Sequence, residues 1–253
     1  MLKFNETKFS TIRFNGIDSK FKNIFVAEKI SIPFAQKKIK SVPVIGRNGN
    51  LTIDNNTYED IEIPIKFYMF GDEITAKNCN AIRNWLTNIE DNKLLLPQGT
   101  KENVGVYFRV KYVKIENLER ANKINKRLFK FGATFVCEPF QYISTGISLD
   151  MAHINGKSYT WNSTNVIPST PLFKIKGEGL ITLTVNEKEV VVDVGQSCII
   201  DTKRRICYKN DETFRNTKMK GDYENLYFKN GENIITWNGN IKELDIQDDE
   251  IVC

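Results

Sequence analysis

The sequence lacks the features that define several classes of protein. No apolar run is long enough to cross a membrane as a helix. The first residues lack the apolar core of a secretion signal, so we expect the chain to fold in a cytoplasm. The single histidine, His153, has no second histidine and no nucleophile motif to accompany it. We therefore predict a protein that is not an enzyme and that holds no metal or cofactor.

Cysteine is also sparse and is not organised as a framework. The five cysteines are scattered along the chain, their number is odd, and none of them forms a CxxC pair. This pattern argues against a disulfide scaffold and against a zinc site. Cys79, Cys137 and Cys198 lie in apolar runs, so we interpret them as small buried side chains.

Charge is present but unevenly distributed. Residues 1–140 contain 23 Lys and Arg against 15 Asp and Glu, whereas residues 141–253 contain 13 against 16. The difference in sign suggests two domains with different neighbours. The basic excess is modest and no nucleic-acid motif accompanies it, so we do not predict specific binding of nucleic acid.

One stretch, residues 72–91, predicts an amphipathic helix in a chain that otherwise indicates short strands. Its apolar residues, among them Trp85 and Leu86, recur at a spacing of three to four. Asp72 is suited to cap the first turn, and Asp91 and Asn92 are suited to end the last one. We expect this helix to pack on a sheet, with Trp85 and Leu86 as its anchors.

Three segments alternate apolar and polar residues as half-buried strands do: 61–68, 104–115 and 128–137. The last two can pair as a long hairpin. Phe108, Val110 and Tyr112 share one face of the first strand, and Phe129, Phe131 and Phe135 share one face of the second. Such an aromatic ladder can stack nucleic-acid bases, but it is more typical of a sheet face packed on a core.

The segment 39–45 indicates an extended strand that lies at an edge or carries a bulge, because Pro43 cannot donate a backbone hydrogen bond. Gly46, Arg47, Asn48 and Gly49 follow it, and the two glycines can supply positive φ at a tight turn. A phosphate-binding loop is a second reading of these residues. No helix and no Lys-Ser/Thr pair follows them, so the turn is favoured.

The second half of the chain predicts a separate β domain. Residues 144–171 have the composition of a linker, and residues 172–253 contain short strands separated by Gly- and Asn-rich turns. We therefore expect an N-terminal domain over 1–143 and a β-sandwich or jelly roll over 172–253. Such a sandwich allows an alternative function, binding of carbohydrate on an aromatic platform formed by Trp161, Tyr223 or Trp237.

Several short pieces, taken in order, resemble the distal tail proteins (Dit) of long-tailed bacteriophages that infect Gram-positive hosts. The likeness rests on the order and spacing of the pieces over nearly the whole chain. The pieces are residues 14–16, 46–49, 82–86, 94–97, 135–140, 171–177, 198–201, 206–208 and 230–233.

This resemblance implies a mainly β fold. It comprises an N-terminal domain with a sheet, one helix and a long hairpin, followed by a galectin-like C-terminal β-sandwich. It also implies a virion protein, of a phage, a prophage or a tail-like particle, assembled in the bacterial cytoplasm as a homohexameric ring at the tail tip. The ring would join the tail tube to a tail-associated lysin or tail-spike protein, leave a channel for DNA, and in some relatives carry receptor-binding proteins.

In such a ring the 104–137 hairpin is suited to cross to the next protomer, because unpaired strand edges are templates for pairing. The structural and interface candidates are Gly46, Arg47, Gly49, Trp85, Leu86, Phe108, Val110, Tyr112, Phe129, Phe131 and Phe135.

Overall fold

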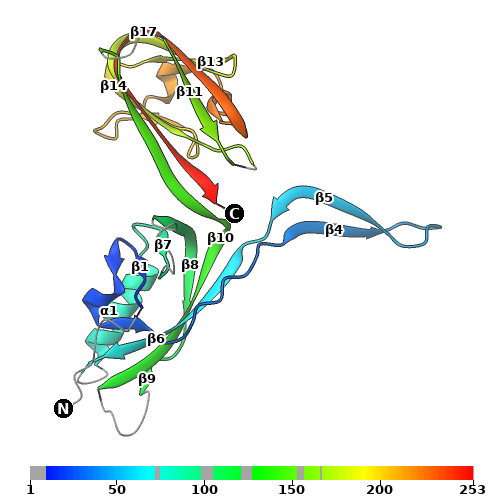
Figure 1. Ribbon diagram of the computed structural model, residues 1–253, viewed down its shortest axis with the longest axis vertical. Coiled ribbons are helices and arrows are strands. Elements are labelled where there is room, and N and C mark those ends of the chain that lie inside the picture. Colours follow the sequence, from blue (N-terminus) through cyan, green and yellow to red (C-terminus); the bar gives the residue numbers. More distant parts are fainter. Residues whose placement is uncertain are drawn as a thin grey trace. The chain divides into compact units, whose positions relative to one another are not determined.

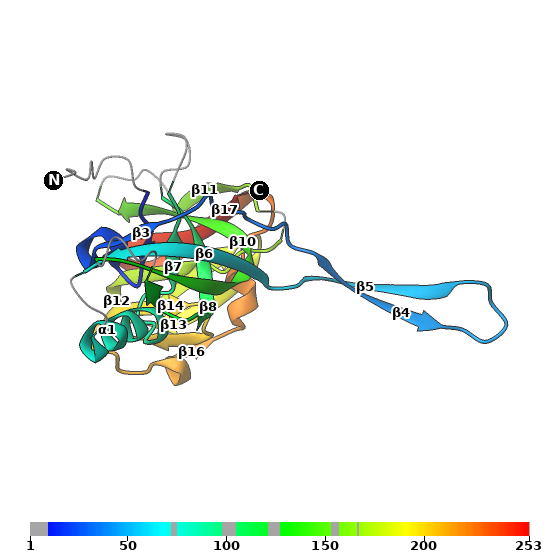
Figure 2. The same ribbon diagram turned by 90° about the horizontal axis from the view of Figure 1, so that it is seen from below.

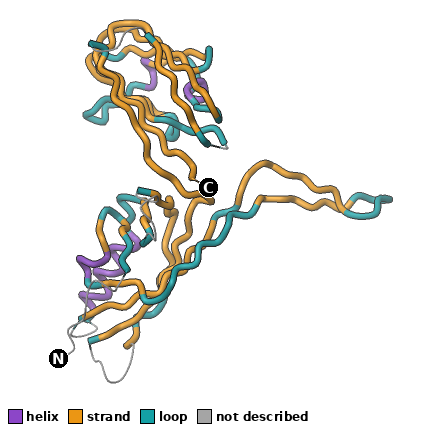
Figure 3. The backbone as a smooth tube through the Cα atoms, viewed as in Figure 1, coloured by secondary structure: helices purple, strands orange, loops and turns teal. Residues whose placement is uncertain are grey.

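The computed structural model describes residues 10–71, 75–97, 105–120, 127–152, 157–165 and 167–252, without the side chains of 76 and 252. The chain divides into two compact units, Met1–Gln141 and Tyr142–Cys253. The boundary lies inside one strand, β10 (Leu128–Asp150), which contributes to both units. Strands dominate both units, as predicted, and the helix α1 belongs to the first (Figure 1, Figure 3).

The N-terminal unit is built around the pairing of β6 (Ile61–Phe70) with the first half of β10. The other elements of this unit are β1 (Arg13–Phe14), β2 (Ile17–Asp18), η2 (Ser19–Lys22), β3 (Ile24–Val26), β4 (Lys37–Pro43), β5 (Asn50–Tyr58), α1 (Ala76–Thr87), β7 (Lys93–Leu95), β8 (Val106–Ile115) and β9 (Glu119–Arg120). On one side of β10 the strands follow in the order β8, β7, β1 and β2. On its other side β10 pairs with β6, which in turn pairs with β3.

The alternation predicted for 61–68 is confirmed, because every second residue of β6 from Ile61 to Met69 is buried. Opposite β6, Phe129, Phe131 and Phe135 of β10 are also buried. Phe131 pairs with Phe67, and their rings stack with centroids 5.0 Å apart. The aromatic ladder is therefore part of a hydrophobic core.

Helix α1 is shorter than expected and is capped by other residues than those expected. Its N-cap is Thr75, whose hydroxyl accepts from the backbone N–H of Asn78 at 3.2 Å; Asp72 lies outside the described residues. The helix ends at Thr87 because Asn15, from the β1–β2 turn, binds its C-terminal end. The Asn15 amide donates to Asn88 O at 2.5 Å and to Trp85 O at 3.2 Å.

The same turn also fixes the helix through Trp85. The indole Nε1 donates to Phe14 O at 3.0 Å, and the Phe14 and Trp85 rings meet edge to face. Trp85 and Leu86 are buried, so the prediction that they anchor the helix on the sheet is confirmed. A turn some 70 residues away in sequence thus sets where the helix ends.

The C-terminal unit is organised by two long bent strands, β12 (Leu172–Val185) and β17 (Gly231–Val252). The first half of β12 pairs with β14 and the second half with β13. The other elements of this unit are β11 (Ser158–Ser163), β13 (Lys188–Asp193), β14 (Gln196–Asp201), β15 (Ile206–Tyr208), η4 (Asn216–Lys218), β16 (Met219–Lys220) and η5 (Tyr223–Leu226).

The Gly-rich segment 177–179 is not one of the turns expected between short strands but a bulge inside β12. The β12–β17 register shifts after Lys176 and again after Glu178. A Cβ on Gly177 would lie 2.4 Å from Asn240 O, so only glycine fits where the strands cross so closely. Because β12 bends at this bulge, its first half pairs with β14 and its second half with β13, and the strands together enclose a core.

The expected linker over 144–171 is largely strand. Its described residues include the end of β10 and the whole of β11, which pairs with β17. Its polar composition misled the prediction, because Ser and Thr on these strands face outward and bond to acidic neighbours. Ser144, for example, donates to Asp249 at 2.7 Å. Residues 226–229, in the part of the chain predicted to contain short strands, contribute only the end of η5 and an isolated bridge at Phe228.

Candidate functional site

The feature of the N-terminal unit that is not used for its own packing is the hairpin of β4 and β5, which we call the arm (residues 37–58). Figures 1 and 2 show it extending away from the N-terminal sheet. It forms a two-stranded sheet of its own, in which Val42 pairs with Leu51 and Lys40 with Ile53. At its tip Gly46 and Gly49 have φ of 82° and 80°, as the sequence predicted.

The arm is kinked near its base by an irregularity in β5. The register jumps between the pair Lys37–Tyr58 and the pair Ile39–Asp54, which leaves extra residues on β5. Asp54 Oδ1 accepts from the backbone N–H of Asn56 at 2.8 Å, and Asn56 has a φ of 53°. This local turn is the mechanism by which Asn and Asp bulge a strand.

One face of the arm is largely apolar and lies open. Since side chains alternate along a strand, Val42, Val44, Leu51 and Ile53 share a face, and Lys40 is on the same side. Except for Val42, which is half-buried, these residues are exposed. Two more apolar side chains are exposed nearby: Ile45 at the tip of the arm (104%) and Phe34 in the segment before β4 (91%). An exposed apolar surface of this kind marks an interaction site.

The arm is also basic. It carries Lys37, Lys38, Lys40 and Arg47 against one acidic residue, Asp54. Lys37 Nζ and Asp54 Oδ2 form an ion pair of 2.7 Å across the strands. Their hydrogen bond is the main reason that the pKa of Lys37 is raised and that of Asp54 is lowered. The remaining cations give the arm a positive field that favours an acidic partner surface.

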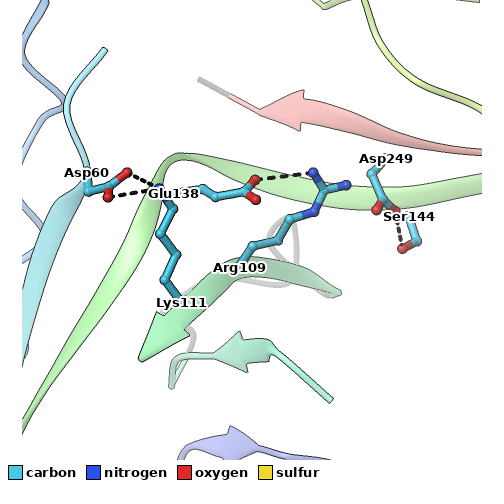
Figure 4. Close-up of polar contacts among 6 residues, drawn as sticks. All are labelled: Asp60, Arg109, Lys111, Glu138, Ser144 and Asp249. Carbon is cyan, nitrogen blue, oxygen red and sulfur yellow. Dashed lines mark hydrogen bonds and ion pairs between the residues drawn. The ribbon is translucent and has the colours of Figure 1, made fainter. Parts of the chain in front are cut away.

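The base of the arm is fixed to the body of the N-terminal unit. Asp60, at the junction of β5 and β6, accepts from Lys111 Nζ of β8 at 2.7 and 2.8 Å (Figure 4). Tyr58 meets Phe140 of β10 edge to face at 5.0 Å. The backbone N–H of Glu59 donates to Gln36 O at 2.8 Å. These contacts limit the directions in which the arm can point.

A second polar pair links β8 and β10, the two strands that the base of the arm contacts. Arg109 of β8 and Glu138 of β10 approach to 3.3 Å, and their side chains are 12% and 26% exposed (Figure 4). In the second unit, the Ser144–Asp249 hydrogen bond, also drawn in Figure 4, joins β10 to β17.

The structure divides the candidates named from sequence into two groups. Gly46, Arg47 and Gly49 lie at the tip of the arm. Most of the others are buried within the N-terminal core and do not face a partner: Trp85, Leu86, Phe108, Val110, Phe129, Phe131 and Phe135. Tyr112 differs, since it is 51% exposed on β8.

The hairpin expected to project, 104–137, is correctly predicted as a pairing of β8 with β10 but lies in the sheet. The projecting hairpin is the arm. Sequence reasoning did not name Leu51 and Ile53 as interface residues, because their alternation resembles that of any half-buried strand. Among the described strands, no third one pairs with these two to cover their apolar face, and alternation along the chain does not indicate this.

Two of the three aromatic residues named for a carbohydrate site are core residues. Trp161 and Trp237 belong to the C-terminal core and are 7% and 5% exposed, so neither offers a sugar platform. The third, Tyr223, is half-buried and packs against that core. In the described part of the chain, no group of three or more His, Cys, Asp or Glu residues could hold a metal ion. His153 lies outside the described residues. No helix among the described residues is long and apolar enough to span a membrane.

Comparison with known proteins identifies one fold. No protein-family model and no curated protein sequence matches the chain. Among solved structures, the chain is similar to the SPP1 Dit (gp 19.1) protein, described as a paradigm of the hub adsorption apparatus in phages that infect Gram-positive hosts. The TM-score is 0.66 at 12% identity, over 97% of this chain and 100% of that one. The chain therefore has the fold of a Dit hub protein.

Proposed function

We propose that this chain is a structural hub protein of a phage tail tip. The observation that carries the proposal is the agreement of fold over essentially the full length of both chains, with a TM-score of 0.66. A likeness confined to one common β domain would carry little functional weight, because such domains host many functions. Here both units occur together in one chain, as they do in the hub protein.

The finer form of the proposal is a homohexameric ring. Its hub is residues 1–143, and its outer part is a galectin-like domain over 172–253 whose sheet also includes the end of β10 and β11. The ring joins the tail tube protein to a tail-associated lysin or tail-spike protein and surrounds a channel for DNA. The outer domains are available to carry a receptor-binding protein. The protein works in the virion tail and performs no bond-making chemistry.

The arm is the element we assign to ring closure, in place of the 104–137 hairpin. An isolated two-stranded hairpin is only marginally stable in water, so the open apolar face needs a cover. A second copy of the chain fits best, because the basic arm suits a chain whose residues 141–253 are net acidic. Arm on one side and acceptor on the other make a heterologous interface, which closes into a ring or continues as a filament.

The test is to image the purified full chain by negative stain and to measure its mass in solution. Sixfold rings with a central hole are expected. The variant carrying Leu51→Lys and Ile53→Lys should be folded and monomeric. Phe21→Lys is the matched control, since Phe21 is 85% exposed away from the arm and its replacement should leave the rings intact.

A monomer at high concentration would contradict the ring, and so would rings that survive the arm substitutions. If the protein is a monomer, its role in the tail would have to be tested by looking for it in virions. If rings survive the arm substitutions, a surface other than the arm closes the ring.

A further inference from the structure

Two thiols that are separated in sequence meet inside the C-terminal unit. Cys198 lies on β14 and Cys207 on β15, where Ile200 pairs with Cys207. Cys198 shares a face with Ile200, since the two are two residues apart on a strand, and so it lies beside Cys207. Their sulfur atoms are 3.0 Å apart, and the side chains are 1% and 0% exposed. That separation is only about 1 Å longer than a disulfide bond.

A guanidinium group stands next to the pair. The backbone N–H of Arg215 donates to Cys207 O at 2.6 Å, and Cys207 N donates to the side chain of Asn216. Arg215 Nε is buried without a hydrogen-bond partner in the described structure. Arg215 as a whole is half-buried, and a partly desolvated cation of this kind favours a negative charge nearby.

The two thiols are consequently unequal. The hydrogen bond between the two thiols lowers the pKa of Cys207, with help from the charge of Arg215, although burial opposes both effects. The same hydrogen bond and burial raise the pKa of Cys198. The thiolate form is therefore more favoured at Cys207 than at Cys198. This is the usual division between an attacking and a resolving cysteine.

We propose that Cys198 and Cys207 form a redox-active dithiol, which hydrogen peroxide converts into an intramolecular disulfide. The Cys207 thiolate attacks one peroxide oxygen; an S–O bond forms, the O–O bond breaks, and the departing hydroxide takes the Cys207 proton to become water. The Cys198 sulfur then attacks the sulfenic sulfur. An S–S bond forms, the S–O bond breaks, and hydroxide leaves with the Cys198 proton as a second water. The thiols lose two electrons and the peroxide gains them.

The remaining described cysteines provide an internal contrast. Burial raises the pKa of Cys137 to about 12, and its Sγ has the backbone oxygen of Phe135 as neighbour at 3.6 Å. Cys79 is half-buried on α1, in the other unit. Neither has a sulfur partner among the described residues. The dithiol is a property of the β14–β15 sheet and does not depend on the proposed tail role.

The experiment treats the fully reduced Cys253→Ser chain with hydrogen peroxide and follows intact mass. Disulfide formation removes about 2 Da, the mass of two hydrogens. Trypsin cleaves after Lys203, Arg204 and Arg205, which separate the two cysteines, so the product should join two peptides. Cys79→Ser is the matched control and should behave as its parent. Cys207→Ser should lose the mass decrease completely.

Two further variants test the assigned roles. Cys198→Ala removes both the resolving thiol and the hydrogen bond that lowers the pKa of Cys207, so Cys207 should oxidise more slowly, stop at the sulfenic acid and be trapped by dimedone. Arg215→Gln should slow the oxidation about tenfold at neutral pH and move its pH midpoint upward, whereas Arg215→Lys should change it less. Two results would overturn the proposal. One is that both thiols stay free while Cys79 oxidises. The other is that Cys207 goes to sulfinic acid with Cys198 present.

Discussion

The N-terminal unit contains two long hairpins, the arm and the β8–β10 pair, that use similar alternating sequences in opposite ways. In the β8–β10 pair the apolar residues Phe108, Phe129 and Phe135 are buried. In the arm, Leu51 and Ile53 are exposed. Alternation of apolar and polar residues therefore determines which side chains share a face of the hairpin. Whether that face is buried depends on the other strands and helices that pack against it. β10 also pairs with β6, and α1 lies against β8, whereas the arm has only its own two strands.

The junction between the hairpins explains the separation. Glu59 and Asp60 interrupt the chain after β5, and β6 then pairs with β10 instead of continuing the arm. The Asp60–Lys111 ion pair and the Tyr58–Phe140 contact hold this junction against the sheet. The arm is therefore attached to a stable body without being part of its core.

The largest effect should come from removing the arm. Lys37 and Tyr58 are paired across its base, so a two-residue turn can replace residues 38–57. We expect complete loss of rings with an unchanged melting temperature, because the arm contributes nothing to the core. Size-exclusion chromatography with light scattering and a thermal melt provide the two readings. A large drop in melting temperature would show that the two hairpins are less different than the structure indicates.

The opposite pattern is expected for the core side of the comparison. Trp85→Ala removes a buried ring and its hydrogen bond to Phe14 O, and should lower the free energy of unfolding by about 3–5 kcal/mol. We also expect weaker ring assembly, since α1 supports the sheet to which the arm is fixed. Urea unfolding measures the first effect. Trp85→Phe, which keeps an aromatic ring, is the control and should cost less; intact rings with unchanged unfolding in Trp85→Ala would contradict this role.

A buried carboxylate extends the comparison from apolar to charged groups. Asp248 of β17 is 3% exposed and accepts from Ser169 Oγ at 2.6 Å. Burial is the main cause that raises its pKa to about 6, and the hydrogen bond only partly offsets it. Between about pH 4 and 6 the folded state holds a proton that the unfolded state has released. Stability should therefore fall as pH rises through this window.

Asp248→Asn should remove that pH dependence and stabilise the protein at pH 7 by at most about 3 kcal/mol, the equivalent of two pKa units. Chemical unfolding at several pH values between 4 and 7 gives the measurement. Asp222→Asn is the control, because Asp222 is exposed. If the free energy of unfolding of the wild type rose with pH between about 4 and 6, the result would contradict a raised pKa at Asp248.

The smallest effect on stability is expected at the junction itself. In the Asp60–Lys111 pair the side chains are 37% and 47% exposed, so Asp60→Asn should change the free energy of unfolding by less than about 1 kcal/mol. We nevertheless expect fewer closed rings, because the arm loses a contact that directs it. Lys114→Met, which breaks the Lys114–Glu62 pair on the same strand, is the matched control and should assemble normally. Equal ring yields from the two variants would deny the junction any part in assembly.

The sequence by itself determined the local features of this protein. Helical spacing placed α1 and named Trp85 and Leu86 as its anchors, and period-two alternation identified β6, β8 and β10. The two glycines at 46 and 49 indicated the turn that the arm uses. These predictions succeeded because they depend on residues close in the chain, where spacing alone decides which side chains share a face.

Only the tertiary structure decided the long-range features. Asn15 ends α1 from another part of the sequence, and Gly177 is needed because β17 passes close to it. Cys198 and Cys207 meet through the register of β14 and β15, which cysteine spacing does not encode. Which hairpin projects depends likewise on which strands find a third partner. The physical reason is common to all four: each depends on a neighbour brought in by folding, and a one-dimensional pattern specifies a face without naming what will cover it.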